Sequence, residues 1–148
     1  MLKRSTNIPI DQVLIEDDGS HLLIKTRING KIARLLIDTG ASRSVFDMER
    51  IRFFVNEKFF LPHDKLSTGL GTNSMATSTV TLKTLKIGEL TIENFPAVLL
   101  DLQHVNGTYH TLGHSEIDGV IGNDILVKYK AIINYKKLLL TLMLNVKR

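Results

Sequence analysis

The sequence has no cysteine, no apolar run long enough to cross a bilayer, and no concentrated block of positive charge. Without cysteine, neither a disulfide framework nor a cysteine-ligated metal centre can form. The net charge of +4 is modest, and basic residues at both ends are balanced by interspersed acids, so a nucleic-acid-binding face is not indicated. The polar start, Met1–Asn7, lacks the apolar core of a secretory signal. We therefore expect a cytoplasmic protein without nucleic-acid or membrane partners.

The length and composition are those of an ordinary globular protein. The chain has 148 residues, of which 43% are hydrophobic and 23% charged. A chain of this size can bury a core of its own and corresponds to about one domain. No internal repeat or linker is visible, so we predict a single domain over residues 1–148.

The stretch Leu35–Ser42 reads Leu-Leu-Ile-Asp-Thr-Gly-Ala-Ser and is the most informative part of the sequence. Its apolar start predicts a strand buried on both faces, and Asp38 follows where that strand gives way to a turn. We expect this carboxylate at a buried position, which is costly unless the group is paired or hydrogen-bonded. An ordinary strand-end turn is the alternative interpretation. The candidate loop consists of Asp38, Thr39, Gly40, Ala41 and Ser42.

A hairpin is predicted to present this carboxylate. His21–Ile28 and Lys31–Ile37 have the composition of strands, and Asn29-Gly30 between them favours a two-residue turn. Further predicted elements are strands at Ile10–Glu16, Thr79–Ile87, Leu90–Ile92 and Phe95–Leu100, a terminal hairpin of Ala131–Tyr135 with Leu138–Leu144, a helix at Met48–Glu57 capped by Asp47, and an irregular loop at Asp101–Glu116.

A second motif lies at Ile117–Leu126, where two apolar residues precede Gly122 and a short helix is predicted from about Asn123. Together with Asp-Thr-Gly-Ala at 38–41, this motif resembles the aspartic proteases, in particular the retroviral type, the retropepsins. The resemblance covers roughly Ile10 to Leu144. It implies an all-β fold, a closed acid-protease β-barrel lobe with one or two short helices. It also implies that Val120, Ile121 and Gly122 thread beside the Asp38 loop.

The resemblance implies an aspartic endopeptidase with Asp38 as its catalytic residue. Because the sequence contains a single Asp-Thr-Gly, the second carboxylate would come from another subunit of a homodimer. Thr39 would lock the two loops together, and Gly40 would permit their close approach. Terminal strands would help to hold the dimer, and a flap would close over a polypeptide substrate. By position and glycine content, the flap residues are Gly69, Leu70, Gly71 and Thr72.

Two competing interpretations are kept. One is a retropepsin-like dimer that binds extended peptides but is catalytically weak or silent. The other is a metal site built from His104, His110 and His114, of which the last two could share a helical face. Gly113 and Asn106-Gly107 argue against a helix there, so we interpret these as solvated loop histidines and expect neither a metal nor a cofactor.

Overall fold

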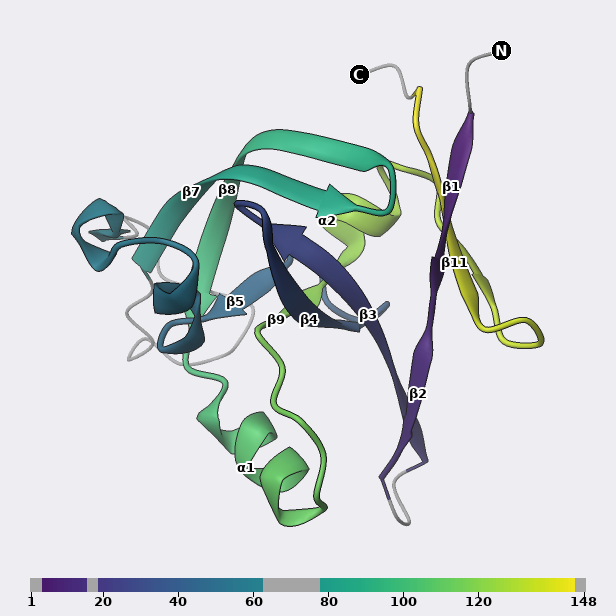
Figure 1. Cartoon of the computed structure of the whole chain (residues 1–148), viewed down its shortest axis with the longest axis horizontal. Coiled ribbons are helices and arrows are strands. Elements are labelled where there is room, and N and C mark those ends of the chain that lie inside the picture. Colours follow the sequence, from purple (N-terminus) through teal and green to yellow (C-terminus); the bar gives the residue numbers. More distant parts are fainter. Residues whose placement is uncertain (1–3, 16–18, 63–77, 146–148) are drawn as a thin grey trace.

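The computed structural model describes residues 4–15, 19–62 and 78–145, and shows a mostly β protein (Figure 1). Six strands, β3, β4, β9, β5, β8 and β7 in spatial order, form a sheet that closes where β3 pairs with β7. Two short helices accompany this barrel. The prediction of an all-β closed barrel with one or two short helices is confirmed. Within the described ranges, no helix is both long and apolar enough to cross a membrane.

The described strands and helices follow one another along the chain with these bounds. They are β1 Ser5–Pro9, β2 Asp11–Leu14, β3 Ser20–Ile28, β4 Lys31–Ile37, β5 Val45–Asp47, β6 Leu61–Pro62, β7 Ser78–Ile87, β8 Leu90–Leu100, α1 Gln103–Thr111, β9 Gly119–Ile121, α2 Asn123–Leu126, β10 Ile132–Asn134 and β11 Leu139–Met143.

The predicted hairpin that leads to Asp38 is confirmed. Strands β3 and β4 pair antiparallel from Leu23↔Leu36 to Ile28↔Lys31. Asn29 and Gly30 between them both have positive φ, of 50° and 85°, as a tight two-residue turn requires. The strand β4 that follows therefore reaches the barrel end with a fixed register.

The chain ends form a second, three-stranded sheet in the order β1–β11–β10. Figure 1 shows β1 and β11 side by side, and Ser5 at the start of β1 lies opposite Met143 at the end of β11. The predicted terminal strand Leu138–Leu144 corresponds to β11, the central strand of this sheet, which pairs with β1 on one side and with β10 on the other. In this sheet the outer strands are β1, which the sequence analysis did not predict, and β10.

Two predicted segments differ from the structure. The region Met48–Glu57 is not one helix but contains two short 3-10 turns, Arg50–Phe53 and Glu57–Phe59. The supposed irregular loop Asp101–Glu116 contains helix α1, which includes Asn106-Gly107. Tertiary contacts account for α1, because its one fully buried aromatic side chain packs in a core separate from the barrel interior. This second core consists of Val13, Ile15, Leu23, Leu102, Tyr109, Ile117 and Val120.

Candidate active site

Asp38 follows directly after β4, the barrel strand that lies beside β9. These two strands pair in parallel, with Leu36 opposite Val120 and Ile37 opposite Ile121. The backbone N–H of Asp38 extends the ladder by donating to the carbonyl oxygen of Ile121 at 3.0 Å. The two motifs singled out in the sequence thus lie side by side, although they are more than eighty residues apart in the chain.

The loop after Asp38 is a compact turn closed by its own carboxylate. The backbone N–H of Gly40 donates to Asp38 Oδ1 at 2.9 Å, and that of Ala41 donates to the Asp38 carbonyl at 3.2 Å. Asp38, Thr39, Gly40 and Ser42 are exposed, whereas Ala41 is half-buried. The expectation of a buried carboxylate is wrong for the single chain, because the loop projects beyond the end of the barrel strand.

Helix α2 holds this loop from the other side. The Asn123 backbone N–H donates to the Ala41 carbonyl at 2.8 Å, and its side-chain amide donates to the Thr39 carbonyl at 2.7 Å. Asp124 accepts from both the backbone N–H and the hydroxyl of Ser44, at 2.9 and 2.7 Å. Sequence reasoning missed Ser44, Asn123 and Asp124; the signal was the polar pair at the start of a short helix.

Gly122 is required by how closely the two motifs approach. A Cβ at this position would lie 2.7 Å from the carbonyl carbon of Arg43 and 2.8 Å from the carbonyl oxygen of Ala41. Contacts this short would displace backbone, which cannot give way as a flexible side chain can. The backbone N–H of Gly122 also donates to the Ser44 hydroxyl at 2.9 Å. This glycine therefore fixes the distance between the second motif and the Asp38 loop.

A hollow of about 260 Å³ opens beside Asp38. Its walls come from the ends of β3 and β4, the Asp38 loop, and the strand and turn that begin the terminal hairpin. The lining residues are Ser20, His21, Leu22, Leu36, Ile37, Asp38, Thr39, Ile133 and Tyr135. In Figure 1, β3 and β4 form the side of the barrel that faces the terminal sheet.

The predicted flap residues, Gly69 to Thr72, lie outside the described residues. The described strands on either side of this segment, β6 and β7, pair antiparallel through Leu61↔Thr79 and Pro62↔Ser78. The flap therefore stays a prediction from the sequence.

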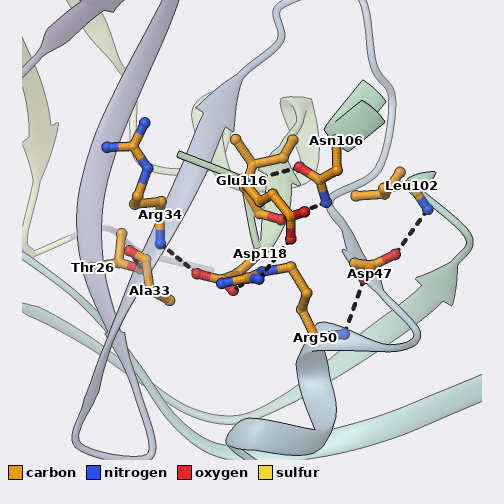
Figure 2. Close-up of polar contacts among 10 residues, drawn as sticks. Thr26, Ala33, Arg34, Asp47, Arg50, Leu102, Asn106, Glu116 and Asp118 are labelled. Carbon is orange, nitrogen blue, oxygen red and sulfur yellow. Dashed lines mark hydrogen bonds and ion pairs between the residues drawn. The ribbon is translucent and has the colours of Figure 1, made fainter. Parts of the chain in front are cut away.

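An ion-pair network holds the start of the second motif, immediately before β9 (Figure 2). Asp118, immediately before β9, is 4% exposed. Its carboxylate accepts from Arg50 Nε at 2.7 Å and from the backbone N–H of Arg34 at 2.8 Å. Arg50 also contacts Glu116 at 2.8 Å. Partial burial lowers the pKa of Arg50, but its hydrogen bonds and charge pairing with Asp118 and Glu116 outweigh burial and raise the pKa.

Two further polar side chains, Asp47 and Asn106, link α1 to neighbouring parts of the chain (Figure 2). Asp47, at the end of β5, accepts from the backbone N–H groups of Arg50 and Leu102, both at 2.9 Å. Asn106 exchanges two hydrogen bonds with the backbone of Ile117, at 2.7 and 3.0 Å. The sequence analysis did not identify this network, since its members are spread over the chain and only the fold brings them together.

The histidines considered as metal ligands are not gathered at one place. His104 and His110 are exposed on α1. His114 lies beyond α1 and has Nε2 at 3.2 Å from the carbonyl of Leu14. In residues 4–15, 19–62 and 78–145, no group of three or more histidine or acidic side chains is placed to hold a metal ion.

Comparisons with known proteins agree with this geometry. Residues 24–125 match the family model described as aspartyl protease, and these residues include the Asp38 loop and Val120–Gly122 of the second motif. Among curated proteins, none matches the chain significantly. A retropepsin-like aspartic protease from Rickettsia conorii is 22% identical, with a TM-score of 0.55, over 97% of this chain and 95% of that one.

A second similar structure is the retroviral protease-like domain of Ddi1 from Leishmania major. It is 14% identical, with a TM-score of 0.55, over 86% of this chain and 94% of that domain. At these identities the two structures support the fold alone, whereas the family match covers more than half of the sequence. The chain therefore belongs to the aspartyl protease family and has the single-lobe, retropepsin-like form of its fold.

Proposed function

We propose that this protein is an aspartic endopeptidase that works as a homodimer, with one Asp38 from each subunit in a shared active site. The observation that carries the proposal is the placement of Asp38. Its carboxylate is exposed, yet its loop is held by β9 on one side and by α2 on the other. The sequence has one Asp-Thr-Gly, so a second copy of the chain is the natural source of the partner carboxylate.

The proposed chemistry needs two carboxylates that share one proton. Two such groups about 3 Å apart cannot both be ionised, so one is charged and the other protonated. The charged Asp38 takes a proton from a water molecule as the water oxygen attacks the peptide carbonyl carbon. The protonated Asp38 gives its proton to the carbonyl oxygen. When the resulting tetrahedral intermediate breaks its C–N bond, a proton passes to the leaving nitrogen.

The other loop residues have supporting roles in this proposal. Thr39 and Gly40 are exposed in the single chain and are therefore free to meet the same residues of a second copy. The Gly40 N–H donates to Asp38 Oδ1, which fixes the orientation of the carboxylate. Gly69–Thr72 would close over an extended peptide, with further substrate contacts in the hollow beside Asp38.

The test is digestion of a peptide library by the purified protein, by its Asp38→Asn variant, and by the protein with pepstatin. We expect cleavage by the parent alone, because Asn is nearly isosteric but cannot take a proton from water. Cleavage by a purified Asp38→Asn sample above trace level would overturn the assignment of Asp38. Peptide binding without cleavage by the parent would instead identify a catalytically silent, peptide-binding dimer.

A further inference from the structure

His21 is the basic side chain of the hollow beside Asp38. Among the residues that line this hollow, His21 alone can carry a positive charge, and Asp38 alone a carboxylate. The other polar lining residues, Ser20, Thr39 and Tyr135, offer hydroxyl groups. With about 260 Å³, the hollow is smaller than the roughly 300–1,000 Å³ typical of small-molecule sites. A hollow of this size can take one side chain of a peptide.

Tyr109 contacts the imidazole of His21. The Tyr109 hydroxyl lies 2.7 Å from His21 Nδ1, and the two ring centroids are 5.7 Å apart. Burial raises the pKa of Tyr109, and the charge of Arg34 opposes this only in part, so the phenol keeps its proton. The phenol can therefore donate to Nδ1, and the hydrogen of a neutral imidazole is then on Nε2. His21 thus offers an Nε2–H donor whether its ring is neutral or protonated.

Helix α1 brings Tyr109 to this place. Tyr109 is 0% exposed and is the aromatic residue of the second core, whose contacts tie α1 to strands β2, β3 and β9. The barrel closes without α1, which takes no part in either sheet. Its one polar link to the hollow among the described residues is the contact between Tyr109 and His21. Helix α1, which lies outside the barrel, is thus linked through Tyr109 to the wall of the candidate active site.

We propose that His21 is a specificity-determining residue that binds an acidic side chain, Glu or Asp, of the peptide substrate in this hollow, with Tyr109 as its positioning residue. The inference rests on the proposed peptidase function and adds to it the substrate class. A carboxylate is the strongest acceptor that a peptide can offer to an imidazole N–H, since bonds between charged partners are the strong ones. Without His21, Asp38 would be the one charged group among the lining residues, and its carboxylate repels another.

The first test compares matched synthetic peptides that differ only in having Glu or Leu at the position where a library digest shows an acidic preference. For the parent we expect kcat/KM to favour the Glu peptide by about tenfold, which corresponds to about 1.4 kcal/mol. His21→Leu should remove this ratio, mainly through KM, because the contact lies away from the reacting atoms. Tyr109→Phe should reduce the ratio while the Leu peptide is still cleaved. His110→Leu, on the exposed face of α1, is the matched control and should keep the ratio.

The second test does not depend on cleavage. The full-length Asp38→Asn protein is titrated with two decapeptide pools, identical except that one has Glu where the other has Leu, while histidine ring signals are followed by NMR. We expect the Glu pool to bind more tightly and to shift one ring signal, and His21→Leu in the same background to abolish both effects.

The outcomes separate the two proposals. Cleavage with an unchanged Glu-to-Leu ratio in His21→Leu overturns the role of His21 and leaves the peptidase intact. If the parent cleaves nothing but the Asp38→Asn protein prefers the Glu pool through His21, the peptidase proposal fails and the acidic site stands. If His21→Leu converts a dimer to a monomer in sedimentation, His21 serves a subunit contact and the inference is wrong.

Discussion

Asn123 joins the start of α2 to the loop after Asp38, because its side-chain amide donates to the carbonyl oxygen of Thr39 at 2.7 Å. Its backbone N–H reaches the same loop at Ala41. The Thr39–Gly40 peptide unit, next to the candidate catalytic residue, is therefore held by a residue 84 positions after Thr39 in the sequence. The loop is therefore held by contacts made within the single chain.

Removing the side-chain amide of Asn123 should affect activity more than stability. In Asn123→Ala the backbone bond to Ala41 remains, but the Thr39 carbonyl loses its side-chain donor. We expect kcat to fall by about tenfold and the free energy of unfolding by about 1 kcal/mol, the usual worth of one hydrogen bond. Lys128→Ala, exposed just beyond α2, is the control and should change neither. Full kcat in Asn123→Ala would show that the loop is fixed by other contacts.

Gly122→Ala should damage the site through the backbone. The added methyl group would lie within 2.8 Å of backbone atoms of Arg43 and Ala41, so the loop or α2 must move. We expect a loss of about 2 kcal/mol or more of stability, as for other overpacked positions, together with most of the activity. Urea unfolding and peptide cleavage measure the two effects. Gly107→Ala is a matched control, since a Cβ there meets nothing within 4 Å; equal losses in both variants would contradict the explanation.

Removing the guanidinium of Arg50 should destabilise the fold. Asp118 is nearly fully buried, and Arg50→Leu would leave its carboxylate with the Arg34 N–H as its described partner. Breaking such a pair from one side costs about 3 kcal/mol, somewhat less where the cation is partly exposed, as here. In contrast, Arg52→Leu alters an exposed pair with Glu49 at 3.5 Å and should cost under about 1 kcal/mol. Chemical unfolding of both variants decides; equal midpoints would be inconsistent with a buried anchor at Asp118.

Tyr109 predicts a loss of stability at alkaline pH. Burial raises its pKa above the ordinary value of 10.0, with a smaller opposing effect from Arg34. The folded state therefore keeps a proton that the unfolded chain loses, so stability is complete below about pH 10 and falls as the pH rises through the folded pKa. Tyr109→Phe should show a smaller fall between about pH 9 and 11. Tyr135→Phe, which alters an exposed ring, should follow the parent; if Tyr109→Phe does so too, this account of Tyr109 is wrong.

The barrel and its approach to Asp38 could be predicted because their signals are local. Asn29-Gly30 stands between two strand-like segments, where this pair favours a tight turn. The apolar run that precedes Asp38 is a strand whose end fixes where the carboxylate lies. The pairing of the two motifs followed from the family resemblance rather than from periodicity. In each of these cases, neighbouring residues or a known pattern carry enough information.

The errors arose where distant residues decide the local structure. Asn106-Gly107 argued against a helix, yet Asn106 is buried and its amide exchanges two hydrogen bonds with the backbone of Ile117. Asp47 was expected to cap a long helix, but its carboxylate also binds the Leu102 N–H, and two 3-10 turns follow instead. Asp38 was expected to be buried because its strand is. Exposure at a strand end depends on what covers the loop, which the strand's own residues do not determine.

The most direct test of the shared active site is a mixing experiment. Parent protein is incubated with a fourfold excess of the full-length Asp38→Asn variant until subunits have exchanged, and cleavage of one library-derived peptide is then measured. If each active site needs Asp38 from two subunits, random pairing leaves about one-fifth of the parent activity, since only one parent subunit in five meets another. Activity that stays at the parent level, while subunit exchange is shown independently, would mean that one Asp38 suffices and would contradict the account.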